Sequence, residues 1–181
     1  GAAFGNPMVY MEKFLENLTL DDADTQRGLK LAYAKRAFVP VLCGAGTRAI
    51  GAGSLLSFLV QYGISPLEHP GFATTKEDVT LKCDPAAPAL AFVYKAVVEP
   101  HVGELNFVRL VQGKLTMGMD VMNTGKQGRE RVGQMLIVRG KGKEEVKELV
   151  AGDMAALVKL RSTTINDTLS AKLDVQVKPI V

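Results

Sequence analysis

The hydrophobic pattern of this chain changes its period near Ala89, and that change limits the folds available to it. After Ala89, apolar residues alternate with polar ones, as in the run that places Leu90, Phe92 and Tyr94 on one face. Similar runs follow, separated by glycines at positions 103, 113, 125, 128 and 140. Short strands at regular spacing predict a closed β-barrel over residues 89–181. We expect its core to contain Phe92, Leu105, Phe107, Leu115, Val121, Leu136, Ala155 and Leu157.

Before this point the pattern is mixed. Apolar residues three and four positions apart predict helices over residues 8–18, 19–38 and 52–63, the last ended by Gly63. The β-branched run at 37–44 predicts a strand. Residues 1–70 therefore form a small α/β domain, proline-rich residues 71–88 a linker, and residues 89–181 the barrel. The predicted fold class is α+β and mainly β.

Composition gives the broad class of protein. The chain has 47% hydrophobic and 23% charged residues, and no apolar run reaches the roughly 20 residues that cross a bilayer. No secretory signal pattern opens the sequence, so we expect a cytoplasmic protein without a membrane partner. Cys43 and Cys83 have no CxxC spacing and are expected to stay reduced. Because the first residue is glycine, we expect a piece of a longer protein.

The positive charge is concentrated in one segment. Residues 126–147 contain seven Lys or Arg and three Glu, whereas the whole chain has a net charge of +3. A local cationic segment attracts polyanions, nucleic acid above all. The alternative is a charged edge hairpin that prevents aggregation and binds nothing.

The segment "MNTGKQGRERVG" (122–133) contains Gly-Lys but does not form a phosphate loop. That motif requires Gly, four residues, then Gly-Lys-Ser/Thr, and here Gln127 replaces the hydroxyl residue. Alternation on both sides predicts a hairpin whose turn is residues 123–126, with Asn123 and Gly125 supplying positive φ angles.

Other candidate chemistry is weak. Cys43, His69, Cys83 and His101 are 14 to 26 residues apart, and no close pair could anchor a metal. We predict no metal site. Asp153 and Asp167 lie in turn sequences, where aspartate commonly bonds its own backbone, so we interpret them as turn residues and not as acid/base catalysts.

The β part resembles domain II of elongation factor G and related translational GTPases, from Phe92 to Leu160 and at "NDTL" (166–169). The family pattern "P-x-x-G-x-L-x-F-x-R-x-x-x-G-x-L" falls on residues 100–115, and its "AGD" on residues 151–153. The basic "VRGKGKEEV" and "INDTL" depart from elongation factor G itself and favour a divergent paralogue.

Residues 38–66 resemble the end of the family's G domain, which includes the guanine loop, and the preceding helices resemble the end of its G′ insertion. The loop usually reads Gly-Ser-Ala and here reads Gly44-Ala45-Gly46, followed by Thr47. Ala45, Gly46 and Thr47 are thus the implied guanine contacts in the intact parent, through backbone amides and without the serine hydroxyl. The family's phosphate loop, Asp-x-x-Gly and Asn-Lys-x-Asp are absent from the sequence.

The resemblance implies a non-catalytic fragment of a ribosome-dependent GTPase of protein synthesis that acts in translocation or a related step. GTP and Mg²⁺ would bind only the intact parent, and the fragment itself would need no cofactor. The implied partners are small-subunit ribosomal RNA and the parent's own G domain. The RNA contacts would be Lys126, Arg129, Arg131, Arg139, Lys141 and Lys143. A ribosomal-protection GTPase and a free-standing small-barrel enzyme using Cys43 or Cys83 stay open as alternatives, as does the oligomeric state.

Overall fold

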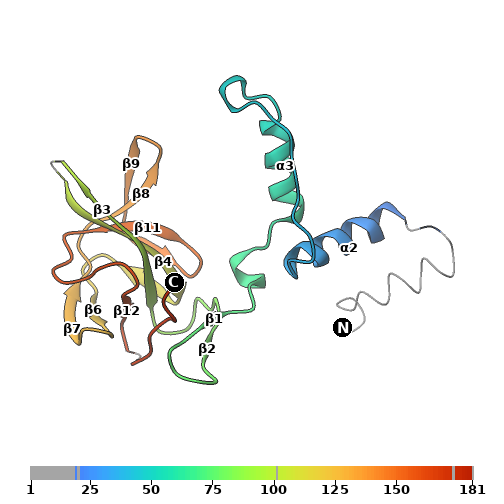
Figure 1. Ribbon diagram of the computed structural model, residues 1–181. Helices are drawn as coiled ribbons and strands as arrows, with labels where there is room; N and C mark the ends of the chain where they lie inside the picture. The colour runs from blue at the N-terminus through green and yellow to red at the C-terminus, as the bar shows by residue number, and fades with distance from the viewer. Residues whose placement is uncertain (1–18, 20, 101, 173, 181) are drawn as a thin grey trace. The chain divides into compact units, whose positions relative to one another are not determined.

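The computed structural model contains two compact units, Gly1–Ile64 and Ser65–Val181 (Figure 1). It describes residue 19 and residues 21–100, 102–172 and 174–180. The helix predicted over residues 8–18 lies outside these ranges. Within them, no helix is long and apolar enough to cross a bilayer.

Two helices form the described part of the first unit. Helix α2 (Asp22–Ala34) begins after Asp21, whose Oδ1 accepts the Asp24 N–H at 2.7 Å. Helix α3 (Ala52–Tyr62) ends at Gly63, as predicted. An edge-to-face contact between the rings of Tyr33 and Phe58, 5.5 Å between centroids, joins the two helices.

The prediction of a strand over residues 37–44 is wrong. These residues have no sheet partner, and the nearest pairing is an isolated bridge between Ala45 and Ile50. Val39 and Val41 are 83% and 88% exposed. A β-branched run becomes a strand only when another strand pairs with it, and none among the described residues does. Helix α3 also exposes apolar side chains, including Leu56 and Val60.

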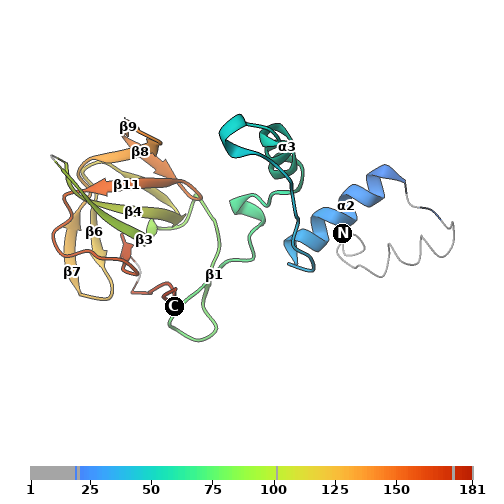
Figure 2. The same ribbon diagram turned by 45° about the horizontal axis from the view of Figure 1, so that its top comes forward.

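The second unit is mainly β (Figures 1 and 2). Its main sheet is antiparallel, in the order β7-β6-β12-β3-β4-β11-β8-β9. The bounds are β3 Leu90–Glu99, β4 Gly103–Gln112, β6 Asp120–Asn123, β7 Gly128–Arg131, β8 Met135–Arg139, β9 Gly142–Val146, β11 Met154–Val158 and β12 Thr168–Ser170. Strands β5 (Lys114–Thr116) and β10 (Glu148–Val150) pair separately.

The sheet curls into a barrel-like form, but the predicted closed barrel is not found. Within the described ranges, the edge strands β7 and β9 do not pair with each other. Strand β9 pairs only with β8, and the chain then turns at Lys147 so that β10 pairs with β5. Closure requires a continuous ladder between the two edges, and this turn interrupts it.

The core is larger than the sequence pattern indicated. Of the predicted core residues, Phe107 is only partly buried and the others are buried. The main cluster lies inside the curl and includes Ala91, Val93, Leu115 and Leu157. Phe92 and Leu105 instead belong to two smaller clusters on the other face of the sheet. Both faces are therefore buried around β3 and β4, so strict alternation does not identify the interior.

The segment predicted as a linker packs in the second unit. It contains β1 (Phe72–Ala73) and β2 (Thr80–Leu81), which pair with each other after the short helix η3 (Pro66–Glu68). Leu81 is buried, and Thr74 forms a bridge with Val177. The boundary between the compact units thus falls after Ile64, earlier than residue 70.

Turn residues explain several motif positions. Strands β6 and β7 form the predicted hairpin, but its turn is residues 124–127, one position later than predicted, and Gln127 supplies the positive φ (54°) in place of Asn123 and Gly125. Gly113 has φ 76°, and a Cβ there would lie 2.5 Å from the Ala87 carbonyl oxygen, so only glycine fits. Asp153 Oδ2 accepts the Val150 N–H at 2.9 Å, which confirms its predicted turn role.

Candidate nucleic-acid interface

The edge strand β7 presents two of the predicted cations together. Arg129 and Arg131 are exposed, whereas Glu130 between them is 2% exposed. Alternate residues of a strand point to the same side, so the two arginines share one face of the edge. Neither guanidinium has an ion-pair partner among the described residues.

Glu130 connects β7 to a loop distant in sequence. Its carboxylate accepts hydrogen bonds from the N–H groups of Arg161 (2.9 Å) and Ser162 (2.8 Å) and from the hydroxyl of Thr163 (2.9 Å). Burial raises the pKa of Glu130, but these hydrogen bonds outweigh that effect and hold the pKa below its usual range. The carboxylate therefore stays charged and fixes the loop against β7.

That loop adds two cations to the arginines of β7. Lys159 and Arg161 are exposed and line the same hollow of about 530 Å³ as Arg129 and Arg131. Asp120, on the strand next to β7, contributes an exposed carboxylate to its lining. The cations outnumber the acids in this hollow, which makes it a candidate site for a polyanion.

Lys126 was predicted to contact RNA, but its ammonium group has partners within the protein. Nζ donates to the Ser162 carbonyl (2.8 Å), Thr164 Oγ1 (2.7 Å) and Asp167 Oδ2 (2.8 Å). Burial raises the pKa of Asp167, but hydrogen bonds from Lys126, Thr164 and Asn123 and the charge of Lys126 bring it below its ordinary value. The Thr164 N–H bond, at 2.7 Å, is the local turn bond predicted for Asp167.

The remaining predicted cations belong to a different edge of the sheet. Arg139, Lys141 and Lys143 lie on the β8–β9 hairpin, which is separate from the β6–β7 hairpin in both ribbon views (Figures 1 and 2). Lys143 pairs with Glu99 of β3. Among the residues that the structure describes, Arg139 makes only a long contact with Glu144, at 3.9 Å between exposed groups. The cations of the basic segment are thus divided between two surfaces, one at each edge of the main sheet.

The implied guanine loop is a tight turn in the first unit. Ala45 and Ile50 exchange two backbone hydrogen bonds, at 2.9 and 3.2 Å, and Gly46–Arg48 form the short helix η2. Gly46 and Thr47 are therefore at the N-terminal end of η2, where amide groups lack intrahelical partners. Of the three predicted guanine contacts, Ala45 thus has its N–H bonded to the Ile50 carbonyl.

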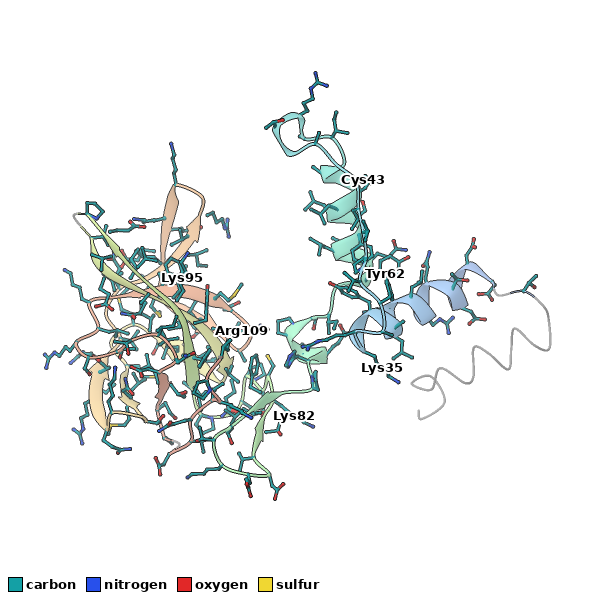
Figure 3. All side chains as sticks on the ribbon, viewed as in Figure 1. Lys35, Cys43, Tyr62, Lys82, Lys95 and Arg109 are labelled. Atoms are coloured by element: carbon teal, nitrogen blue, oxygen red, sulfur yellow. The ribbon has the colours of Figure 1, made fainter. Side chains whose placement is uncertain are left out.

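The thiols and histidines do not form a site within the described residues. Cys43 is exposed in the first unit (Figure 3) and Cys83 is partly buried in the second, and both are free. His69 Nδ1 accepts the Gly71 N–H at 3.1 Å, and its ring stacks on Phe72. His101 is outside the described ranges. No three metal-ligating side chains cluster in the part of the chain that the structure describes.

A second hollow lies over the other face of the sheet. It measures about 400 Å³ and is mainly apolar, with Phe72, Phe92 and Tyr94 among its lining residues. The motif residue Arg109 (Figure 3) lies over the Phe72 ring at 5.2 Å. Burial raises the pKa of Tyr94, so its hydroxyl is neutral at physiological pH. The lining of this hollow includes two cations, the half-buried Arg109 and the exposed Lys178, whereas the lining of the β7 hollow includes four.

Comparison with known proteins agrees with the barrel part of this description. Residues 88–172 match the family model of elongation factor G domain 2. A crystal structure of a protein from Thermus thermophilus has the same fold, with a TM-score of 0.70 and 24% sequence identity. The match covers 94% of this chain and 24% of that one, so this chain spans about a quarter of that protein's length.

Proposed function

We propose that this chain, whose residues 88–172 match the model of elongation factor G domain 2, is a translation-factor module that docks on small-subunit ribosomal RNA through the β7 edge. The observation that carries this proposal is the pair Arg129 and Arg131, exposed on one face of an edge strand and without ion-pair partners among the described residues. Guanidinium groups bind phosphate bidentately, so contacts of this kind fix a protein on RNA without reading bases.

Arg139 and Lys141 on the β8–β9 hairpin supply a second, weaker contact in this proposal. Lys126 and Lys143 act indirectly, because their ammonium groups pair with Asp167 and Glu99. The docking surface is therefore smaller than the basic segment of the sequence.

We further propose that this chain does not hydrolyse GTP and that its parent is a ribosome-dependent GTPase. No Gly-Lys-Ser/Thr and no Asn-Lys-x-Asp occur in the 181 residues, so phosphate and Mg²⁺ would be held by other parts of the parent. The amides of Gly46 and Thr47 would contact guanine there, whereas the Ala45 N–H donates to the Ile50 carbonyl. Incubation of the purified chain with GTP should release no phosphate.

The docking proposal is tested by binding of the chain to purified small ribosomal subunits at about 50 to 200 mM salt. We expect the variant R129E/R131E to bind at least tenfold more weakly and to reduce the slope of log K against log salt by about 1.5. The control K82E/K172E makes the same change in net charge at exposed lysines elsewhere on this unit. An equal loss in both variants would contradict a specific edge contact.

A further inference from the structure

Four cations from two distant segments meet at one hollow. Arg129 and Arg131 come from β7, and Lys159 and Arg161 come from the loop between β11 and β12. None of the four side chains has an ion pair within the described ranges. Strands β11 and β12 are far apart in the sheet, so the loop crosses from one part of the curl to the other before β12 pairs with β6.

The backbone at Lys159 is held in an uncommon conformation. Its φ is 61°, in the left-handed region, which costs energy for a residue with a Cβ. Val158 and Leu160 on either side are buried, so the neighbouring side chains impose this conformation. The result is that Lys159 is exposed and lines the hollow with the arginines.

Glu130 fixes the next residues of the loop. Successive N–H groups of Arg161 and Ser162 point at its carboxylate, an arrangement that binds anions well. The Ser162 and Thr163 hydroxyls add further hydrogen bonds, at 3.2 and 2.9 Å. In Glu130→Gln the side chain is neutral and has one oxygen and one NH₂ group. The NH₂ group would face these N–H and O–H donors and cannot accept their hydrogen bonds.

We propose that Arg129, Arg131, Lys159 and Arg161 form one binding site for the phosphodiester groups of an RNA backbone, and that Glu130 is its positioning residue. This inference rests on the proposed docking function and adds to it. Glu130 makes no contact with the RNA. It holds the loop so that the cations of Lys159 and Arg161 are placed beside those of β7 before binding, which reduces the ordering cost of binding.

The test compares Glu130→Gln with Glu104→Gln, using the full chain and purified small ribosomal subunits. Both variants raise the net charge by one, and Glu104 is on β4 with no ion pair among the described residues. Net charge alone predicts slightly tighter binding by both. We expect Glu130→Gln to bind on the order of tenfold more weakly, with a salt slope lower by about 1.5, because two phosphate contacts are lost.

A double-mutant cycle separates positioning from general stability. In the K159A/R161A background, which keeps the backbone N–H groups, Glu130→Gln should cause no further loss of binding. A further loss of similar size would overturn the positioning role. Amide NMR spectra should show the barrel folded in every variant, and Thr163→Val, which removes one donor and keeps the charge of Glu130, should give a smaller loss in the same direction.

The outcomes for docking and positioning can be told apart. If R129E/R131E weakens binding and Glu130→Gln does not, docking stands and the positioning role is overturned. If R129E/R131E also has no effect, the docking proposal itself fails. A short RNA duplex of about 16 base pairs is the second probe, and equal effects on both probes would indicate backbone recognition without sequence reading.

Discussion

The two edges of the main sheet carry similar charges but are built differently. At the β7 edge, buried Glu130 and partly buried Asp167 connect the hairpin to the loop after β11. At the β9 edge, Lys143 pairs with Glu99, and each side chain is about one-third exposed (28% and 33%). At the first edge Glu130 and Asp167 lie inside and the arginines outside, with Asp120 as an exposed acid, whereas at the second edge both partners of the Lys143–Glu99 pair are partly exposed. Charge in a sequence therefore does not reveal which cations are free to bind.

The largest expected difference between the edges is in stability. Glu130→Ala should lower the free energy of unfolding of the second unit by about 3 kcal/mol, because buried donors of the loop lose a charged acceptor. Glu99→Ala should cost only about 0.5 to 1 kcal/mol, since its ion pair is partly solvated. Urea denaturation, monitored by the NMR signals of the second unit, measures the loss of unfolding free energy in both variants. Similar losses would show that the two edges are equally constrained.

Lowering the pH should destabilise the β7 edge more than the β9 edge. The pKa values of Glu130 and Asp167 are lower in the folded chain than their ordinary values. The stability they contribute is therefore fully present above the unfolded pKa, near 4, and is lost as pH falls through the lower folded values. Glu130→Gln should give a shallower loss of unfolding free energy between about pH 5 and pH 2 than the wild type. Parallel curves would contradict this assignment.

The two lysines that pair with acids should also differ. Lys126→Met removes three hydrogen bonds, one of them to a carboxylate whose side chain is 14% exposed, and should cost about 1 to 2 kcal/mol. Lys143→Met should cost about 0.5 kcal/mol. The same urea experiment compares them. A larger loss for Lys143→Met would reverse the order of the edges.

The sequence predicted the elements at the β7 edge but not their assembly. Alternation and turn residues predicted the β6–β7 hairpin, and the local excess of charge identified Arg129 and Arg131. Lys159 and Arg161 were missed because they follow the basic segment by more than ten residues. Only the pairing of β12 with β6 brings their loop to this hairpin, and such long-range register is not visible in local periodicity.

Lys126 shows the opposite error, because the sequence predicted a free cation where the structure has a bonded one. In the sequence it is equivalent to Arg129, three positions later in the same charged run, and nothing local indicates that its ammonium binds Asp167. The "NDTL" segment (166–169) carries the family resemblance and the turn at Asp167, and this turn also provides the partner of Lys126. Tertiary contacts decide which cations of a charged segment are internal.

The smallest expected effect is at the tip of the β9 edge. Arg139 and Glu144 are 3.9 Å apart, and their side chains are 77% and 66% exposed, so the Coulomb attraction is screened by water and offset by side-chain entropy. Arg139→Ala should change the free energy of unfolding by less than about 0.5 kcal/mol. In ribosomal-subunit binding it should weaken affinity less than Arg129→Ala does, because Arg139 lies near the carboxylate of Glu144 whereas Arg129 lines a hollow with three other cations. If Arg139→Ala weakens binding more than Arg129→Ala, the main RNA contact is at the β9 edge, at Arg139, and not at the β7 edge.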